Sequence, residues 1–202
     1  MKNIYLASRS PRRRELLKQI GVVFQVVQLR EDPRRGPDVD ETPKAAEAPA
    51  DYVLRVARAK AELAVHYLQR RSLQRWPVLA ADTTVVCDQR VIGKPADAED
   101  AVRILTSLSG RPHEVISAVA VALAERVEIA LSLSKVWFRA LSDDEVRRYV
   151  ASGESFDKAG AYAVQGRAAA FVTRIEGSYS GIMGLPLAET ADLLAKFGVD
   201  TV

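Results

Sequence analysis

The sequence is poor in the residues that build disulfides and metal clusters. It has one cysteine, Cys87, and two histidines, His66 and His113, among 202 residues. A single cysteine excludes an intramolecular disulfide and any multi-cysteine metal site. Two histidines are too few for a histidine-rich metal cluster. With 48% hydrophobic and 27% charged residues, the remaining composition is that of an ordinary soluble globular protein.

Long apolar runs and one-sided charge are also missing. The N-terminus lacks the apolar stretch of a signal peptide, and no run is long enough to cross a bilayer. We therefore expect a cytoplasmic protein without a membrane partner. The net charge of +3 suits nucleotides or nucleic acid, but no basic stripe interleaved with aromatic residues is present. Nucleic acid is therefore not expected as a partner.

Several common signature motifs are absent. The sequence has no Gly-x-Gly-x-x-Gly, no Walker loop, no Gly-x-Ser-x-Gly and no His-Glu-x-x-His. These absences exclude the commonest dinucleotide-binding, P-loop, serine hydrolase and zinc protease assignments.

Hydrophobic periodicity predicts alternating helices and strands. The length suits one sizeable domain or two small lobes, and we expect one domain over residues 1–202. Helices are predicted over 11–20, 50–71, 97–108, 142–151 and 185–197. Strands are predicted over 4–7, 22–29, 78–87, 114–124, 129–139 and 168–175. A long polar loop, 30–49, separates the second strand from the second helix, and loops of that length are often functional. The pattern indicates an α/β or α+β fold around one mixed, twisted sheet.

The first predicted helix begins with an unusual concentration of positive charge. Ser10 suits the N-cap and Pro11 the first helical position, and three arginines follow directly, of which Arg12 and Arg13 come first. Cations at this end oppose the helix dipole. Either a polyanion binds there, on serine hydroxyls such as that of Ser8, guanidinium groups and free backbone N–H groups, or the arginines are an ordinary solvated helix start.

Asp82 lies within an apolar strand, Val-Leu-Ala-Ala-Asp-Thr-Thr-Val-Val over 78–86. A buried carboxylate is costly unless it is paired, hydrogen-bonded or bound to a metal. Asp82 is therefore a candidate metal ligand or general base, and the alternative is an aspartate that caps a turn at a strand end.

Three further charged residues are candidates for the same site. Lys94 lies between a glycine and a proline that would hold its ammonium group in place. Lys60 lies near the apolar stripe of its helix, where a lysine either extends to solvent or points into a cleft. Glu41 lies in the long loop, which either folds over a site or is a solvated acidic loop.

The segment 157–166, Asp-Lys-Ala-Gly-Ala-Tyr-Ala-Val-Gln-Gly, combines charge, small residues and an amide. Its small residues would let the backbone approach a ligand closely, and Gln165 offers both a donor and an acceptor for a nucleobase. The alternative is a compact glycine-rich turn with Tyr162 in the core.

These segments together resemble the Maf family of nucleoside triphosphate pyrophosphatases, also called septum-formation-inhibitor-like proteins. The matching segments, in chain order, are Leu-Ala-Ser-x-Ser-Pro-Arg-Arg at 6–13, Asp-Glu at 40–41, Ala-x-x-Lys-Ala at 57–61, Ala-Asp-Thr at 81–83, Gly-Lys-Pro at 93–95, Leu-Ser-Gly-x-x-His at 108–113, Asp-Lys-Ala-Gly-Ala-Tyr at 157–162, Gln-Gly at 165–166 and Gly-Leu-Pro-Leu-x-x-Thr at 184–190. Each is modest alone, but nine in the same order are highly specific.

The resemblance implies hydrolysis of a nucleoside triphosphate to the monophosphate and pyrophosphate, with a divalent metal, Mg²⁺ or Mn²⁺. It implies an elongated fold with a central cleft, similar to inosine triphosphatases, often as a homodimer. Asp82 matches the proton acceptor of the family. Residues expected to hold the phosphates are Ser8, Arg13, Lys60 and Lys94. Glu41 and Asp82 would hold metal or activate water, and the division of these roles stays open.

The resemblance also suggests the substrate. Family members that act on dTTP and UTP carry Arg, Thr and Gln where this chain has Arg12, Thr83 and Gln165, whereas a subgroup acting on 7-methyl-GTP carries Trp at the first position, suited to stacking on a cationic purine. We therefore expect dTTP and UTP as substrates, with roles in nucleotide-pool housekeeping and cell-division arrest. The alternatives are a pyrophosphatase for 7-methyl-GTP or other modified nucleotides, and a non-catalytic regulator of septation that binds nucleotide or nucleic acid.

Overall fold

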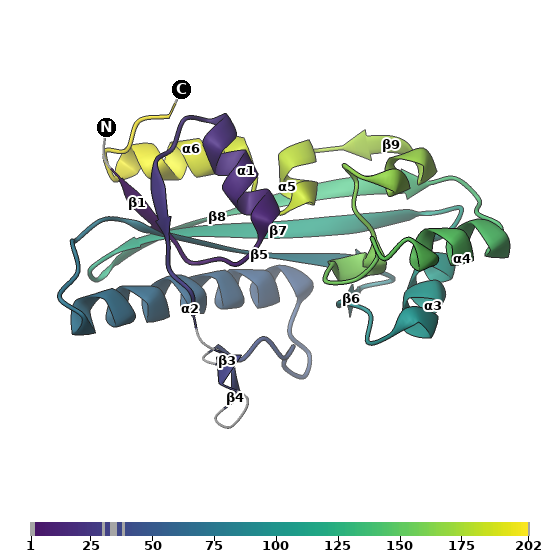
Figure 1. Ribbon diagram of the computed structural model, residues 1–202, viewed down its shortest axis with the longest axis horizontal. Helices are drawn as coiled ribbons and strands as arrows, with labels where there is room; N and C mark the ends of the chain where they lie inside the picture. The colour runs from purple at the N-terminus through teal and green to yellow at the C-terminus, as the bar shows by residue number, and fades with distance from the viewer. Residues whose placement is uncertain (1–2, 30, 33–35, 38, 202) are drawn as a thin grey trace.

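A mixed sheet runs along the molecule in the computed structural model, which describes residues 3–29, 31–32, 36–37 and 39–201 (Figure 1). In this part of the chain seven strands form the sheet, in the order β2-β1-β5-β7-β8-β9, with β6 pairing β5 as well. Their bounds are β1 Ile4–Leu6, β2 Phe24–Val26, β5 Val78–Cys87, β6 Arg90–Ile92, β7 Pro112–Leu123, β8 Arg126–Phe138 and β9 Val172–Glu176.

The strand directions confirm the predicted mixed sheet. Strand β1 is parallel to β2 and β5, whereas β5, β7, β8 and β9 pair antiparallel, and β6 is antiparallel to β5. The long strands β5, β7 and β8 extend through the molecule and carry helices at both ends, which gives the elongated shape in Figure 1.

Helices cover both faces of this sheet (Figure 1). Helix α2 (Pro49–Arg70) lies along one face, and α1 (Pro11–Gln19), α5 (Tyr179–Met183) and α6 (Leu187–Lys196) lie on the other. Helices α3 (Ala98–Leu108) and α4 (Asp143–Ala151) pack together at the end opposite the chain termini.

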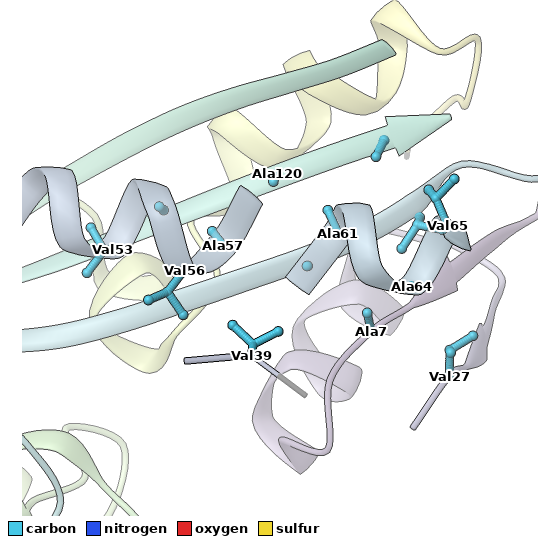
Figure 2. Close-up of a cluster of buried hydrophobic side chains, with 14 of the residues drawn as sticks. Ala7, Val27, Val39, Val53, Val56, Ala57, Ala61, Ala64, Val65 and Ala120 are labelled. Atoms are coloured by element: carbon cyan, nitrogen blue, oxygen red, sulfur yellow. The ribbon is translucent and has the colours of Figure 1, made fainter. Parts of the chain in front are cut away.

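Helix α2 lies close to the sheet because small residues face it. Ala57, Ala61 and Ala64 are fully buried against the strands, together with larger neighbours such as Val53 and Val56 (Figure 2). This regular apolar stripe made the helix predictable. The helix begins one residue before the predicted start because Pro49 takes the first helical position, and it ends at Arg70 with Arg71 as the C-cap.

Among the described residues, side-chain hydrogen bonds cap α3, α4 and α5 but not α1, α2 or α6. Asp97 accepts a hydrogen bond from Asp100 N, and Ser142 forms a capping box with Glu145. Ser10 occupies the N-cap of α1, as predicted, but its side chain makes no capping hydrogen bond. The backbone N–H of Ser10 instead donates to Ser8 Oγ, at 3.2 Å.

Several predicted elements differ from the structure. The strand predicted over 22–29 is limited to β2, and the loop predicted over 30–49 contains a small antiparallel pair, β3 (Glu31–Asp32) and β4 (Gly36–Pro37). Residues 30, 33–35 and 38 of that loop lie outside the described residues. The strand predicted over 168–175 is wrong at its start, because 167–171 form a 3₁₀ helix before β9. Three consecutive alanines there favour helical conformation.

The closing helix is also shorter than the predicted 185–197. The chain first forms α5, then turns at Gly184, whose φ of 116° lies in the left-handed region, and begins α6 at Leu187.

In the described residues no helix is both long and apolar enough to cross a membrane. We propose that 1–202 form one domain, because a single sheet joins all the layers.

Candidate active site

A cleft opens where strand β5 lacks a neighbour on one edge. Strand β1 pairs with β5 only at Val78 and Leu79, and β6 pairs with it only from Val85 onward. Among the described strands, none pairs with 80–84 on this edge. The cleft at this gap has a volume of about 950 Å³. All nine site residues predicted from the sequence line it: Ser8, Arg12, Arg13, Glu41, Lys60, Asp82, Thr83, Lys94 and Gln165.

Two carboxylates meet one ammonium group on the α2 side of the cleft. Lys60 Nζ lies 2.8 Å from Asp82 Oδ1 and 2.9 Å from Glu41 Oε1. Asp82 is 7% exposed, so its charge is compensated by Lys60 as a buried carboxylate requires. Lys60 points into the cleft, which decides between its two predicted orientations, and the turn-cap interpretation of Asp82 is wrong because Asp82 lies inside β5.

Tyr52 is a member of this cluster that the sequence analysis missed. Its hydroxyl donates to the backbone carbonyl of Glu41 at 2.9 Å. Burial, with the nearby charges of Asp82 and Glu41, raises the pKa of Tyr52 to about 12, so it stays a neutral donor. Tyr52, Val56 and Lys60 follow at four-residue intervals, which places them along one side of α2; that spacing was the available signal.

Arg13 lies on the opposite wall and is held by three parts of the chain. Its Nε donates to the Gly184 carbonyl at 2.8 Å, and its two terminal nitrogens donate to Ser8 Oγ and Thr83 Oγ1 at 3.3 and 3.4 Å. Burial lowers the pKa of Arg13, and the charge of Asp82 opposes that shift. Because a guanidinium has five N–H groups, two remain for a ligand.

The Thr83 hydroxyl has a defined direction. Ser117 Oγ donates its one proton to the Gly181 carbonyl at 2.7 Å, so the 2.8 Å contact between Thr83 and Ser117 has Thr83 as donor. Thr83 Oγ1 in turn accepts from Arg13. Ser117, on β7, therefore supports this wall from behind by orienting Thr83.

The remaining predicted residues, Arg12, Lys94 and Gln165, line other parts of the cleft. Burial lowers the pKa of Arg12, and the carboxylate of Asp157 opposes this effect. Lys94 and Gln165 are exposed side chains on the cleft. Lys158 lines the cleft too; burial and then the charge of Arg12 lower its pKa, and its ammonium donates to the Glu154 carbonyl at 2.6 Å.

The small residues of 157–166 serve packing more than ligand approach. Gly160 has φ 71°, and a Cβ there would lie 2.7 Å from Val85 Cγ2. Tyr162 is 6% exposed, with its hydroxyl 2.8 Å from His113 Nε2. The core interpretation therefore holds for Gly160 and Tyr162, while Gln165 stays on the cleft.

The acidic residues suit a hard divalent cation that also binds the substrate. Among the described residues, no group of three His, Cys, Asp or Glu side chains is placed to hold a metal ion. Mg²⁺ usually binds one or two carboxylates together with substrate phosphates, and Glu41 and Asp82 supply two carboxylates in the cleft. This donor set fits Mg²⁺ or Mn²⁺ held partly by a nucleotide.

The chain is similar to known proteins over nearly its full length. It is 57% identical over 196 residues to the dTTP/UTP pyrophosphatase of Aromatoleum aromaticum, covering 96% of this chain and 95% of that protein. It is 54% identical to the protein of the same name from Nitrosospira multiformis, covering 97% and 95%.

A more distant likeness is to the structure of the Staphylococcus aureus Ham1 protein, with a TM-score of 0.47 and 14% identity over 97% of each chain. Residues 3–197 match the family described as Maf-like protein. With this match and relatives more than half identical over almost all of their length, the chain belongs to the Maf family.

Proposed function

We propose that this protein hydrolyses dTTP and UTP to the nucleoside monophosphate and pyrophosphate. The observation that carries the proposal is the convergence of Glu41 and Asp82 on Lys60, in a cleft whose opposite wall carries Arg13. Relatives 57% and 54% identical to this chain bear the name dTTP/UTP pyrophosphatase, which supports the same substrates here.

Cations around the cleft would hold the triphosphate. Phosphoryl transfer depends mainly on positioning and charge neutralisation, and Lys60, Lys94 and Arg13 supply positive charge from three different elements or loops. The Ser8 hydroxyl adds a hydrogen-bonding group beside Arg13. Arg13 is already fixed by its protein contacts, so it would offer its two remaining N–H groups at little entropic cost.

Asp82 is proposed as the general base that takes a proton from the attacking water. Its carboxylate lies in β5 on the cleft, and the 2.8 Å contact with Lys60 Nζ holds it in place to accept the proton. Hydrolysis breaks the anhydride between the α and β phosphates, and the oxygen of water remains on one of the two products.

A divalent cation, Mg²⁺ or Mn²⁺, is the proposed cofactor. Glu41 and Asp82 would hold it, and when bound it would neutralise charge on the phosphates. Lys60 would then balance the remaining negative charge of the two carboxylates.

We propose that Arg12, Thr83 and Gln165 select the nucleobase of the substrate. All three line the cleft, and Thr83 is oriented by Ser117 and Arg13. Arg12 can donate to the acceptor oxygens of a pyrimidine, and Gln165 can both donate and accept.

A substrate panel with pyrophosphate release tests the activity. We expect rapid turnover of dTTP and UTP with Mg²⁺ and little turnover of 7-methyl-GTP. Turnover of 7-methyl-GTP without dTTP or UTP would establish the modified-nucleotide alternative. A folded protein that binds nucleotides yet hydrolyses none, with either metal, would establish a non-catalytic regulator.

The cellular setting follows from the substrate. We propose a cytoplasmic enzyme, because nucleoside triphosphates are made and used there, with a nucleoside triphosphate as its ligand and neither membrane nor nucleic acid as a partner. A homodimer is proposed from the family resemblance, and light scattering of the purified protein tests it.

A further inference from the structure

Three successive backbone carbonyls around Glu41 are bound by side chains of α2. The carbonyl of Asp40 accepts from Arg55 Nη1 at 3.0 Å, that of Glu41 from the Tyr52 hydroxyl at 2.9 Å, and that of Thr42 from Arg55 Nη2 at 3.0 Å. These residues lie outside helices and strands, so the side chains of α2 replace the hydrogen bonds that secondary structure would provide.

Arg55 is itself held rigidly. Its Nε and Nη2 donate to the two carboxylate oxygens of Glu47, at 2.6 and 2.9 Å. Such two-point pairing fixes the plane of a guanidinium. The side chains of Arg55 and Glu47 are only 24% and 10% exposed, and the guanidinium also stacks over the Tyr52 ring, with its carbon 5.6 Å from the centroid.

The ends of this segment are anchored as well. Val39 is 9% exposed and packs in the core cluster beneath α2 (Figure 2). Asp40 Oδ1 accepts from Thr42 N at 2.9 Å, and Glu47 Oε2 accepts from Lys44 N at 3.0 Å. The segment 39–47 is therefore fastened to α2 at residues 40–42 and at Glu47, with Arg55 as its central contact, and its internal hydrogen bonds hold the turn between them.

Such fastening matters because Glu41 would otherwise be poorly positioned. Its side chain is 49% exposed, and an ion pair of that exposure contributes little to fixing a side chain. The catalytic geometry needs the carboxylate at a set place beside Lys60 before the substrate arrives. We propose that Arg55 is a positioning residue that holds the Glu41 carboxylate against Lys60, and that Glu47 in turn holds Arg55; this inference rests on the proposed pyrophosphatase activity.

Arg55→Lys is the first test, because lysine keeps the charge but has a single donor nitrogen that cannot bridge two carbonyls and a carboxylate. Glu47→Gln tests the support of Arg55. Arg58→Lys is the matched control: Arg58 lies one turn farther along α2, its side chain is 51% exposed, and it pairs with Glu62. Circular dichroism and thermal melting verify that each variant is folded.

For Arg55→Lys we expect kcat for dTTP to fall by about tenfold to a hundredfold, the effect of a misplaced catalytic group. The KM for dTTP should change little, while the Mg²⁺ concentration needed for half-maximal activity should rise. Glu47→Gln should show the same pattern more weakly, and Arg58→Lys should match the wild type.

A double variant separates positioning from a general structural effect. In a Glu41→Gln background, Arg55→Lys should cause no further loss of kcat, because the group that it positions is already gone. An equal loss in both backgrounds overturns the inference, as does wild-type behaviour of a folded Arg55→Lys protein. An inactive wild type would instead contradict the proposed function, so the two failures are distinguishable.

Discussion

His113 should make the stability of this protein depend on pH between 4 and 6.5. The ring is 2% exposed, lies edge-on to Phe138 and Tyr162, and contacts the Tyr162 hydroxyl through Nε2. Among the described residues Nδ1 has no hydrogen-bond partner, so the protonated ring would bury an Nδ1–H group and its charge without an acceptor. Burial, and then the charge of Arg111, lower the pKa of His113 from 6.5 to about 4.

The direction of this pH dependence follows from whether the folded or the unfolded state of the protein binds the proton at the higher pH. An unfolded chain protonates His113 near its ordinary pKa, whereas the folded chain resists until about pH 4. Stability is therefore fully present above pH 6.5 and falls as the pH drops toward 4. A shift from 6.5 to about 4 corresponds to about 3 kcal/mol in total, at about 1.4 kcal/mol per pKa unit, and about 2 kcal/mol of it is lost between pH 7 and 5.

Urea unfolding of the wild type and His113→Gln between pH 5 and 8 measures this contribution. Glutamine does not titrate and can still reach Tyr162, so the variant should be less stable at pH 7 but lose about 2 kcal/mol less on going to pH 5. His66→Gln, at an exposed position on α2, is the control and should follow the wild type. Parallel curves for wild type and His113→Gln would refute the argument.

Three further predictions follow from the cleft and its support. Asp82→Asn should keep the fold and nucleotide binding while kcat falls by about 10²-fold to 10⁴-fold, measured by pyrophosphate release and calorimetry; near-normal turnover would remove Asp82 as the base. Gly160→Ala should lower stability by about 1–3 kcal/mol, because its Cβ meets Val85, whereas Gly93→Ala, which meets nothing within 4 Å, should melt with the wild type; equal melting of both variants would contradict this. Arg12→Trp should lower kcat/KM for dTTP and raise it for 7-methyl-GTP, and an unchanged ratio would show that Arg12 does not select the base.

Local patterns predicted the parts of the fold that depend on nearby residues. The apolar stripe of α2, the Asp97 cap and the Ser142 capping box are each readable within a few positions, and all three are present. The 3₁₀ helix before β9 was missed because its continuous apolar run, which leads directly into Val172, resembles a buried strand, while its alanines favour helical turns.

The gap on β5 depends on contacts that no local pattern contains. One limit of the gap is set by where β1 ends, and β1 (Ile4–Leu6) lies far from β5 in the chain. The other limit is set by where β6 begins, after the turn that follows β5. The resemblance supplied the residues of the cleft, but Tyr52 and Arg55 were not among them. Their role depends on the contact between the segment 39–47 and α2, which the sequence does not show. The role of Gly160 also depends on a tertiary contact, because a Cβ at this position would clash with Val85.

The unpaired stretch of β5 also explains how one strand serves both walls of the cleft. Successive residues of a strand point to opposite faces, so Asp82 turns toward Lys60 on α2, and Thr83 turns toward Arg13 and Ser117 on the other side. Because neighbouring strands do not cover this edge, both faces open into the same space. The proposed proton transfer by Asp82 and the proposed nucleobase selection by Thr83 therefore use adjacent residues in separate hydrogen-bond networks. Substitutions at Thr83 should accordingly alter selectivity while leaving the Lys60 cluster in place, because no contact joins Thr83 to it among the hydrogen bonds of the described residues.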